Sequence, residues 1–323
     1  MNVLIQSMSR FYEIRQSAAL YRRLIRPMIA GLALVALTAS ADAQRAFPTA
    51  EAAADALVAA LRSEPGGGIL DVVGRAAFDI LSSGDDVADA AARKRFVDDY
   101  AQKHRLVMHG DREATLVVGP SDVAFPVPLI RTKAGWQFDM ATGRQDLLRA
   151  RIARNEAKAV EASLAFVAAQ QAYAAMTEKE GDRRYAQRII SGPGMKDGLY
   201  WPAAEGQPAS PLSELVDRAV ADGYKPRPRS AYYGYRFKVI AKQGPKAAGG
   251  SYDYSERGKM IHGFALIAYP VQYGHSGVLT FMVNQRGIVY QKDLGAYTTR
   301  FANREIWFNP DQTWRRVQAA GGK

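Results

Sequence analysis

The sequence predicts an α+β fold, in which helices and antiparallel strands occupy separate blocks of the chain. Segments of helical composition and segments of strand composition follow one another in long blocks, whereas a doubly wound parallel sheet alternates element by element. The stretch from Arg144 to Met176 contains no glycine or proline and is rich in strong helix formers. We therefore expect one long central helix, with an N-terminal module before it and a C-terminal module after it.

The first 43 residues have the features of a secretory signal peptide. Three arginines, at positions 22, 23 and 26, precede the apolar run 28–39, and Ala41-Asp42-Ala43 offers a cleavage site after Ala43. The apolar run is shorter than the about 20 residues that a membrane-spanning helix needs. We expect a periplasmic or secreted protein with no transmembrane segment after signal removal. The chain has no cysteine, which excludes disulfides and a lipoprotein anchor.

The N-terminal module, residues 44–143, is expected to combine several helices with a short antiparallel sheet. Helices are predicted at 50–62, with Thr49 as the cap, at 69–78 and at 87–103, where the turn containing Asp85 provides the cap. Strands are predicted at 106–108, 114–118, 125–130 and 136–139. Pro126 and Pro128 lack the N–H group that a sheet ladder needs, so we expect an edge strand or a bulge there.

The central helix carries an apolar stripe that should face a core. Its members are spaced as neighbours on one helical face: Leu148, Ile152, Val160, Leu164 and Val167, widened by Ala159, Ala168 and Ala172. A helix of this length either braces two cores or breaks near Asn155, which is a good residue for a second helix start. We expect Leu164 and Val167 to lie in the interface with the C-terminal sheet.

The C-terminal module, residues 144–323, should contain this helix and an antiparallel meander. Ser210 and Pro211 are expected to open a helix that runs through Asp222. Strands are predicted at 235–241, 263–269, 278–283 and 288–292, with a tight turn at 284–287. One face of this sheet should lie on a helix, because a small sheet cannot bury both faces by itself.

Five short motifs are spread over the chain that follows the signal peptide: Ala46–Thr49, Ile80–Asp85, Asp197–Pro202, Gly234–Phe237 and Val289–Gly295. Their combination resembles the bacterial domain-of-unknown-function family 2950. That resemblance implies an exported bacterial protein and brings no activity or catalytic residue with it.

Each module also resembles a known architecture. The helices and short sheet between Phe47 and Asp139 resemble the cone-shaped cystatin-like fold of SnoaL-like domains. The segment 153–157, Leu164 and the segment 169–173, with the strands that follow Gly234, resemble the helix and head of type IV pilin-like proteins. A pilin helix has a long apolar first half, whereas this helix carries Arg149 and Arg151 there, and charged residues are costly in lipid. The resemblance therefore implies a pilin-head-like fold outside the membrane rather than a filament subunit.

No residue pattern in the sequence defines a catalytic or metal site. In the N-terminal module, His104, His109 and Asp111 are the residues that an acid/base site would use, although a solvated helix end and turn explain them as well. Ser276 and His275 are neighbours in a turn, where adjacent side chains diverge. We expect no catalytic residue, no metal ligand set and no cofactor.

Binding is the role that the sequence favours. The candidate binding residues lie in an ordered glycine-containing loop and in the tyrosine-rich region after it: Lys196, Asp197, Tyr200, Trp201, Tyr233, Tyr235 and His275. The net charge is +11 for the whole chain and +8 once residues 1–43 are removed, which suits an anionic cell-wall polymer or an envelope protein partner, although it also serves solubility alone. The charge is not clustered as in nucleic-acid binders. The alternative is a small-ligand-binding protein or simple acid/base enzyme that uses the cone-shaped N-terminal module. The oligomeric state stays open.

Overall fold

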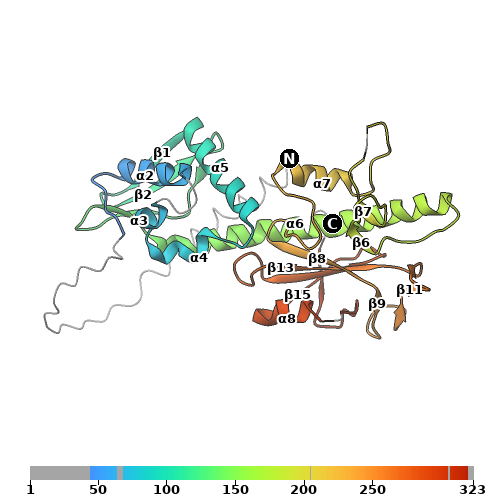
Figure 1. Cartoon of the computed structure of the whole chain (residues 1–323). Coiled ribbons are helices and arrows are strands. Elements are labelled where there is room, and N and C mark those ends of the chain that lie inside the picture. The colour runs from blue at the N-terminus through green and yellow to red at the C-terminus, as the bar shows by residue number, and fades with distance from the viewer. Residues whose placement is uncertain (1–43, 64–67, 204, 305, 319–323) are drawn as a thin grey trace. The chain divides into compact units, whose positions relative to one another are not determined.

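The computed structural model describes residues 44–63, 68–203, 205–304 and 306–318, so the predicted signal peptide, residues 1–43, lies outside this part of the chain. Helices and mostly antiparallel strands form blocks before and after one long helix (Figure 1). The predicted α+β class with a long central helix is confirmed. Within the described ranges, no helix combines the length and the apolar character needed to cross a membrane.

The helices of the N-terminal module begin at the predicted caps. In α2 (Ala50–Arg62), Thr49 Oγ1 accepts a 3.1 Å hydrogen bond from the N–H group of Ala52. In α5 (Asp86–Gln102), Asp85 Oδ1 accepts one of 3.0 Å from Ala88. The helix predicted at 69–78 is divided into α3 (Ile69–Val73), η2 (Arg75–Ala77) and α4 (Phe78–Leu81). The break falls at Gly74, whose φ of 87° does not fit a right-handed helix.

An antiparallel sheet completes this module. Its strands pair in the order β1-β2-β4-β5, with β3 also on β2: β1 (His104–His109), β2 (Glu113–Val118), β3 (Val123–Ala124), β4 (Leu129–Arg131) and β5 (Trp136–Phe138). The strand predicted at 125–130 is interrupted, because Pro126 and Pro128 fall between β3 and β4. Since β4 pairs with both β2 and β5, it is not the edge strand that the prolines suggested.

The central helix α6 (Met140–Lys179) is longer than predicted and unbroken. It begins at Asp139, whose Oδ1 accepts a 3.2 Å hydrogen bond from the N–H group of Thr142. It passes through Gly143, where a Cβ atom would lie 2.5 Å from the Cα atom of Val127. Glycine is thus the residue that lets the helix approach this segment so closely. Asn155 does not start a second helix.

The buried face of α6 differs from the predicted stripe. Leu164 is 46% exposed, and Ala168 and Ala172 are exposed as well, whereas Phe166 is only 2% exposed. The buried face includes polar residues whose side chains bond to the backbone, namely Ser163, Gln170 and Thr177. A pattern that counts only large apolar residues misses these buried polar positions. The predicted stripe was therefore placed on a face of the helix that includes the exposed Leu164. The prediction for Leu164 is therefore wrong, while Val167 is buried as expected.

The C-terminal sheet is the predicted antiparallel meander. Its order is β16-β15-β14-β13-β8, formed by β8 (Tyr235–Ile240), β13 (Ala265–Pro270), β14 (Leu279–Asn284), β15 (Tyr290–Asp293) and β16 (Arg315–Arg316). Gly287 has a φ of 72° in the predicted turn, and its N–H group donates to the carbonyl oxygen of Asn284. Both β13 and β14 contact α6, so the sheet packs on the central helix (Figure 1).

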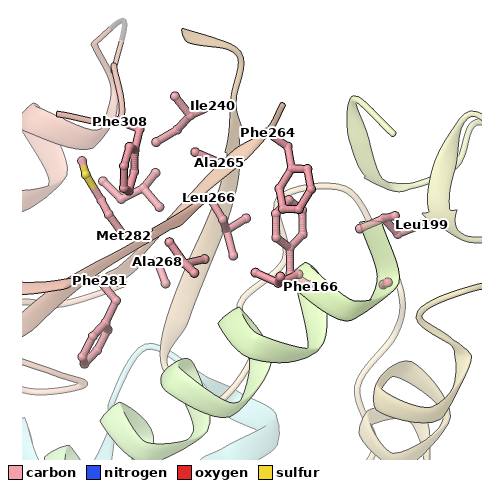
Figure 2. Packing of buried hydrophobic residues seen from close by; sticks show 14 of the residues in the cluster. Phe166, Leu199, Ile240, Phe264, Ala265, Leu266, Ala268, Phe281, Met282 and Phe308 are labelled. Carbon is pink, nitrogen blue, oxygen red and sulfur yellow. The ribbon is translucent and has the colours of Figure 1, made fainter. Parts of the chain in front are cut away.

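This sheet is buried on both faces, whereas we expected one. Figure 2 shows Phe166 of α6 beside Phe264, while Ile240, Met282 and Phe308 gather on the other side of the sheet. The second face is covered because the chain returns after β15, with α8 (Thr298–Ala302) in contact with β13. Every residue of β13 is consequently buried.

Shorter elements connect these parts. They are β6 (Arg188–Ile190) paired in parallel with β7 (Gly198–Tyr200), α7 (Ser213–Ala221), β9 (Lys242–Gln243) paired with β10 (Tyr252–Asp253), β11 (Ser255–Glu256) paired with β12 (Lys259–Met260), and η3 (Gly295–Tyr297). Helix α7 begins at Ser213 rather than at Pro211. Ser210 does not cap this helix, because Leu212 occupies the cap position and no side chain bonds to the free N–H groups.

A buried polar junction joins segments that are distant in sequence. Asp85 Oδ2 accepts hydrogen bonds from the hydroxyl group of Tyr224, at 2.9 Å, and from the N–H group of Gly234, at 2.7 Å. Asn155 Nδ2 donates to the carbonyl oxygen of Ser276 at 2.9 Å. The predicted capping role of Asp85 is confirmed, and the same carboxylate also ties α5 to the start of the C-terminal sheet. The division into domains at residue 144 stays a prediction.

Candidate functional site

A groove with a volume of about 540 Å³ lies beside the C-terminal part of α6. Four of its side chains are cationic, Arg184, Arg188, Lys196 and Lys259, and Asp197 is the one carboxylate among the described residues that line it. The rest of the lining comes from Tyr173, Tyr185, Gln187, Met195 and Gly258. In Figure 1, β6 and the hairpin that contains β11, which carry some of these residues, lie near this part of α6, as does β7.

Buried polar side chains of α6 hold one wall of the groove. Gln170 is fully buried, and its amide group exchanges hydrogen bonds of 2.7 and 2.8 Å with the backbone of Ala186. Thr177 Oγ1 accepts a 3.0 Å bond from the N–H group of Arg184. The Gln170 amide pairs with both backbone groups of Ala186, as the backbone of a neighbouring strand would. The segment that carries Arg184 and Arg188 is therefore fixed to the helix in the absence of a ligand.

The loop between β6 and β7 forms the other wall of the groove. Asp197 Oδ1 accepts a 2.8 Å hydrogen bond from the N–H group of Gly192, and the hydroxyl group of Tyr173 donates to the carbonyl oxygen of Lys196 at 2.9 Å. A Cβ atom on Gly198 would lie 2.7 Å from the nitrogen of Ser191. The loop therefore depends on glycine for its close turn.

Positive charge exceeds negative charge in the groove. Asp182 pairs with Lys259 at 2.8 Å and with Arg184, and the hydrogen bond from Lys259 lowers the pKa of the Asp182 carboxyl group. Asp197 lies 3.5 Å from Arg188. Lys196 has no carboxylate within 4.0 Å among the residues that the structure describes, and its Nζ atom lies 5.6 Å from the ring centre of Trp201. The four cations thus have two carboxylate partners, Asp197 in the groove lining and Asp182 outside it, which leaves capacity for an anionic ligand.

A family model described as protein of unknown function (DUF2950) matches residues 44–317. The chain belongs to this family. The matched range includes the whole groove of this DUF2950 member, and the resemblance seen in the sequence motifs is confirmed. No curated protein and no solved structure matches the chain. The likeness of the two modules to cystatin-like and pilin-head folds stays a prediction.

The structure of this DUF2950 member brings together part of the predicted binding set. Lys196 and Asp197 line the groove, and Trp201 lies beneath Lys196 with only 7% of its surface exposed. Tyr200 is half-buried on β7, and its burial raises the pKa of its hydroxyl group. Trp201 therefore supports the groove from the core and is not available as a flat stacking surface.

The remaining predicted binding residues lie elsewhere. Tyr235 is fully buried, and its hydroxyl group donates to the carbonyl oxygen of Leu279 at 2.8 Å. Tyr233 donates to Asp222 Oδ2 at 2.5 Å, and Lys158 lies over its ring. His275 is half-buried in the turn at 272–277. Since these three residues do not line the groove, we leave them out of the candidate site.

The acid/base candidates of the N-terminal module do not converge. His104 and His109 occupy the two ends of β1, about 16 Å apart at the usual rise of a strand. The ring of His104 stacks on Tyr100, His109 lies 3.0 Å from Thr115 Oγ1, and Asp111 is exposed in the following turn. In the described ranges, no group of three His, Cys, Asp or Glu side chains is arranged to hold a metal ion.

Sequence reasoning did not identify three of the four groove cations. Arg184 and Arg188 belong to a basic stretch directly before the glycine-containing loop, and this local charge was the available signal. Lys259 is brought in by the β11–β12 hairpin, because the N–H group of Tyr185 donates to the carbonyl oxygen of Met260 at 2.7 Å. A contact between residues this far apart in the chain leaves no periodic pattern in the sequence.

Proposed function

We propose that this DUF2950 member is an exported bacterial envelope protein, periplasmic or secreted, whose C-terminal groove binds an anionic cell-wall polymer without catalysing a reaction. The observation that carries the proposal is the excess of cationic side chains in a groove whose walls are already held in place. Export rests on the predicted signal peptide.

A polymer fits this groove better than a small ligand does. The cations of the groove come from three separate segments, around Arg184, Lys196 and Lys259. Such a distribution suits carboxylate or phosphate groups that repeat along a chain. Arginine can hold these groups with two parallel hydrogen bonds, and lysine meets them as a point charge.

Apolar contacts supplement the charge. Met195 is 57% exposed at the rim, and Tyr185 lines the groove beside Arg184. A polymer backbone can lie against these side chains while its anionic groups reach the cations. Because Arg188, Lys196 and Lys259 are exposed, their attraction acts over a Debye length of about 8 Å at physiological salt and weakens as salt is added.

The alternative, a small-ligand or acid/base role for the N-terminal module, has less support, because His104 and His109 lie at opposite ends of β1. Neither histidine lines the groove.

Co-sedimentation with purified peptidoglycan sacculi that retain their anionic polymers tests the proposal. We expect the protein to sediment with the sacculi at low salt and to be released by added salt. Lys196→Glu should lower the bound fraction severalfold. The matched control is Lys133→Glu, which makes the same charge change at an exposed position of the N-terminal module. Equal binding by both variants, or binding that salt does not weaken, would contradict a role for the groove.

A further inference from the structure

Strand β8 forms one edge of the C-terminal sheet. It pairs with β13 on one side, with Tyr235 opposite Pro270 and Lys238 opposite Ile267. On its other side, no strand follows among the residues that the structure describes. An edge strand of six residues is long enough to offer several backbone groups to another chain.

The hydrogen bonds at the start of β8 show which backbone groups point outward. The N–H and C=O groups of Tyr235 bond to Tyr232, at 3.1 and 2.8 Å, and not to β13. Successive residues of a strand point their backbone groups to alternate sides. The groups of Phe237 and Val239 therefore also point away from β13. The N–H group of Val271, directly after β13, donates to the carbonyl oxygen of Gly234. Gly234 therefore points toward β13, as the alternation with Tyr235 requires.

The outward groups between the two ends of β8 are unpaired. Tyr232 closes one end, and at the other end the N–H group of Tyr254 donates to the carbonyl oxygen of Ala241 at 2.8 Å. Between them, the N–H and C=O groups of Phe237 and Val239 have no hydrogen-bond partner within the described part of the chain. Unpaired groups in this arrangement are the template on which an extended peptide adds as a further strand.

The two faces of this edge differ in chemistry. Phe237 and Val239 are half-buried and lie opposite Ala268 and Leu266 in the register. Arg236 and Lys238 are exposed and alternate with them, so they lie on the other face. An added strand would therefore meet apolar side chains on one face and cations on the other.

We propose that the outer edge of β8 binds an extended segment of a partner protein in which apolar residues alternate with acidic residues. Such a segment would pair its backbone with Phe237 and Val239 and set its carboxylates beside Arg236 and Lys238. A second copy of this chain is a poor occupant, because pairing β8 with β8 would bring like charges side by side, which destabilises a strand pair. This surface lies outside the groove and does not depend on the function proposed for it.

Arg236 is the cation best suited to a test. Lys238 already donates to the carbonyl oxygens of Ala302 and Arg304, at 3.3 and 3.0 Å, so replacing it would disturb the end of α8. Arg236 is exposed, and a charge reversal there changes the charge beside the strand edge while the hydrogen bonds of Lys238 stay in place.

Fluorescence anisotropy with a labelled octapeptide of alternating valine and glutamate tests the charge preference. We expect saturable binding, at least about tenfold weaker binding of the same peptide with lysine in place of glutamate, and reversal of this preference by Arg236→Glu. Equal binding of the two peptides, or no saturable binding of either up to about 1 mM, would overturn the proposal.

Val239→Pro tests the backbone pairing. Proline removes the outward N–H group of Val239 but no donor of the ladder to β13, and an edge strand tolerates such a change. We expect binding to weaken about tenfold or more while the circular dichroism spectrum is retained. If this variant does not fold, N-methylation of alternate peptide amides makes the same test on the unchanged protein. The proposal would be overturned if neither the proline variant nor the N-methylated peptide weakened binding. It would also be overturned if the protein associated with itself and Val239→Pro abolished that self-association.

Discussion

The carboxylate of Asp85 accepts a 2.9 Å hydrogen bond from the hydroxyl group of Tyr224, which lies 139 residues later in the chain. Asp85 is only 4% exposed. The Tyr224 oxygen in turn accepts a 3.0 Å bond from the N–H group of Tyr233. A residue that the sequence shows as a simple helix cap is thus the centre of a buried network between the N-terminal module and the C-terminal sheet.

Removing the hydroxyl group of Tyr224 should destabilise the fold. Tyr224→Phe leaves Asp85 and the N–H group of Tyr233 each without one partner, which should lower the free energy of unfolding by about 1–3 kcal/mol. Asp85→Ala should cost more, and the double variant should cost less than the two single changes added together. Urea denaturation measures all three. Tyr297→Phe, at a position that is 72% exposed, is the control and should change stability by less than about 0.5 kcal/mol. Additive effects of Asp85→Ala and Tyr224→Phe would argue against the network.

Two neighbouring positions of α6 should respond very differently to truncation. Phe166→Ala removes a ring that packs against Phe264 at a centroid distance of 5.6 Å, and it should cost about 3–5 kcal/mol of unfolding free energy. Leu164→Ala, at an exposed position, should cost about 0.5 kcal/mol or less. If the two modules are independent domains, urea denaturation will show two transitions, and Phe166→Ala will shift only one of them. A single transition that shifts as a whole would place both modules in one cooperative unit.

Alkaline pH should unfold the protein through its buried tyrosines. Burial raises the pKa of Tyr232 to about 12, and it also raises the pKa values of Tyr224, Tyr233 and Tyr235. A raised folded-state pKa means that the unfolded chain ionises first. The stability held by these neutral hydroxyl groups is therefore complete below pH 10 and is lost as the pH rises through 12 and beyond.

Absorbance at 295 nm, recorded together with circular dichroism, checks this prediction. A late-ionising group of tyrosines should appear as the secondary structure is lost, whereas in concentrated guanidinium all tyrosines should ionise near their ordinary pKa of about 10. Ionisation of every tyrosine near pH 10 with the fold intact would contradict it.

Export should remove the first 43 residues. Mass spectrometry of protein recovered from the periplasm or medium of a bacterial host should give Gln44 as the first residue. Ala41→Asp and Ala43→Asp together should block this cleavage, since signal peptidase reads small residues at these positions. Recovery of the uncleaved chain from the parent sequence would contradict the predicted signal.

Local signals in the sequence were sufficient to predict most helices and strands. Thr49 and Asp85 mark helix starts because their side chains satisfy free N–H groups, and this depends only on the next few residues. The meander follows from alternation and from Gly287 in its turn. Gly143 was less informative, because its role depends on Val127, a residue of another segment.

The candidate site depends mostly on contacts that sequence patterns do not report. Lys196 and Asp197 were identified because they sit in a loop with aromatic neighbours. The approach of Lys259 to Asp182 and the coverage of the second sheet face are set by how distant segments pack. The misplacement of Leu164 has the same cause, since the buried face of α6 includes Gln170 and Thr177, whose burial is stabilised by backbone partners elsewhere.

The unbroken course of α6 constrains the number of residues between its two ends as well as their identity. Each residue of an α-helix advances the chain by about 1.5 Å and turns it by about 100°. One residue inserted near Ala153 would therefore rotate Glu156, which accepts bonds of 3.0 and 2.9 Å from the N–H groups of Val278 and Leu279, away from the sheet. Seven residues would restore the direction to within about 20° but lengthen the helix by about 10 Å. Exposed positions in this part of α6, such as Ala153 and Ala157, can thus accept substitutions, whereas an insertion or deletion would move Glu156 away from its backbone partners.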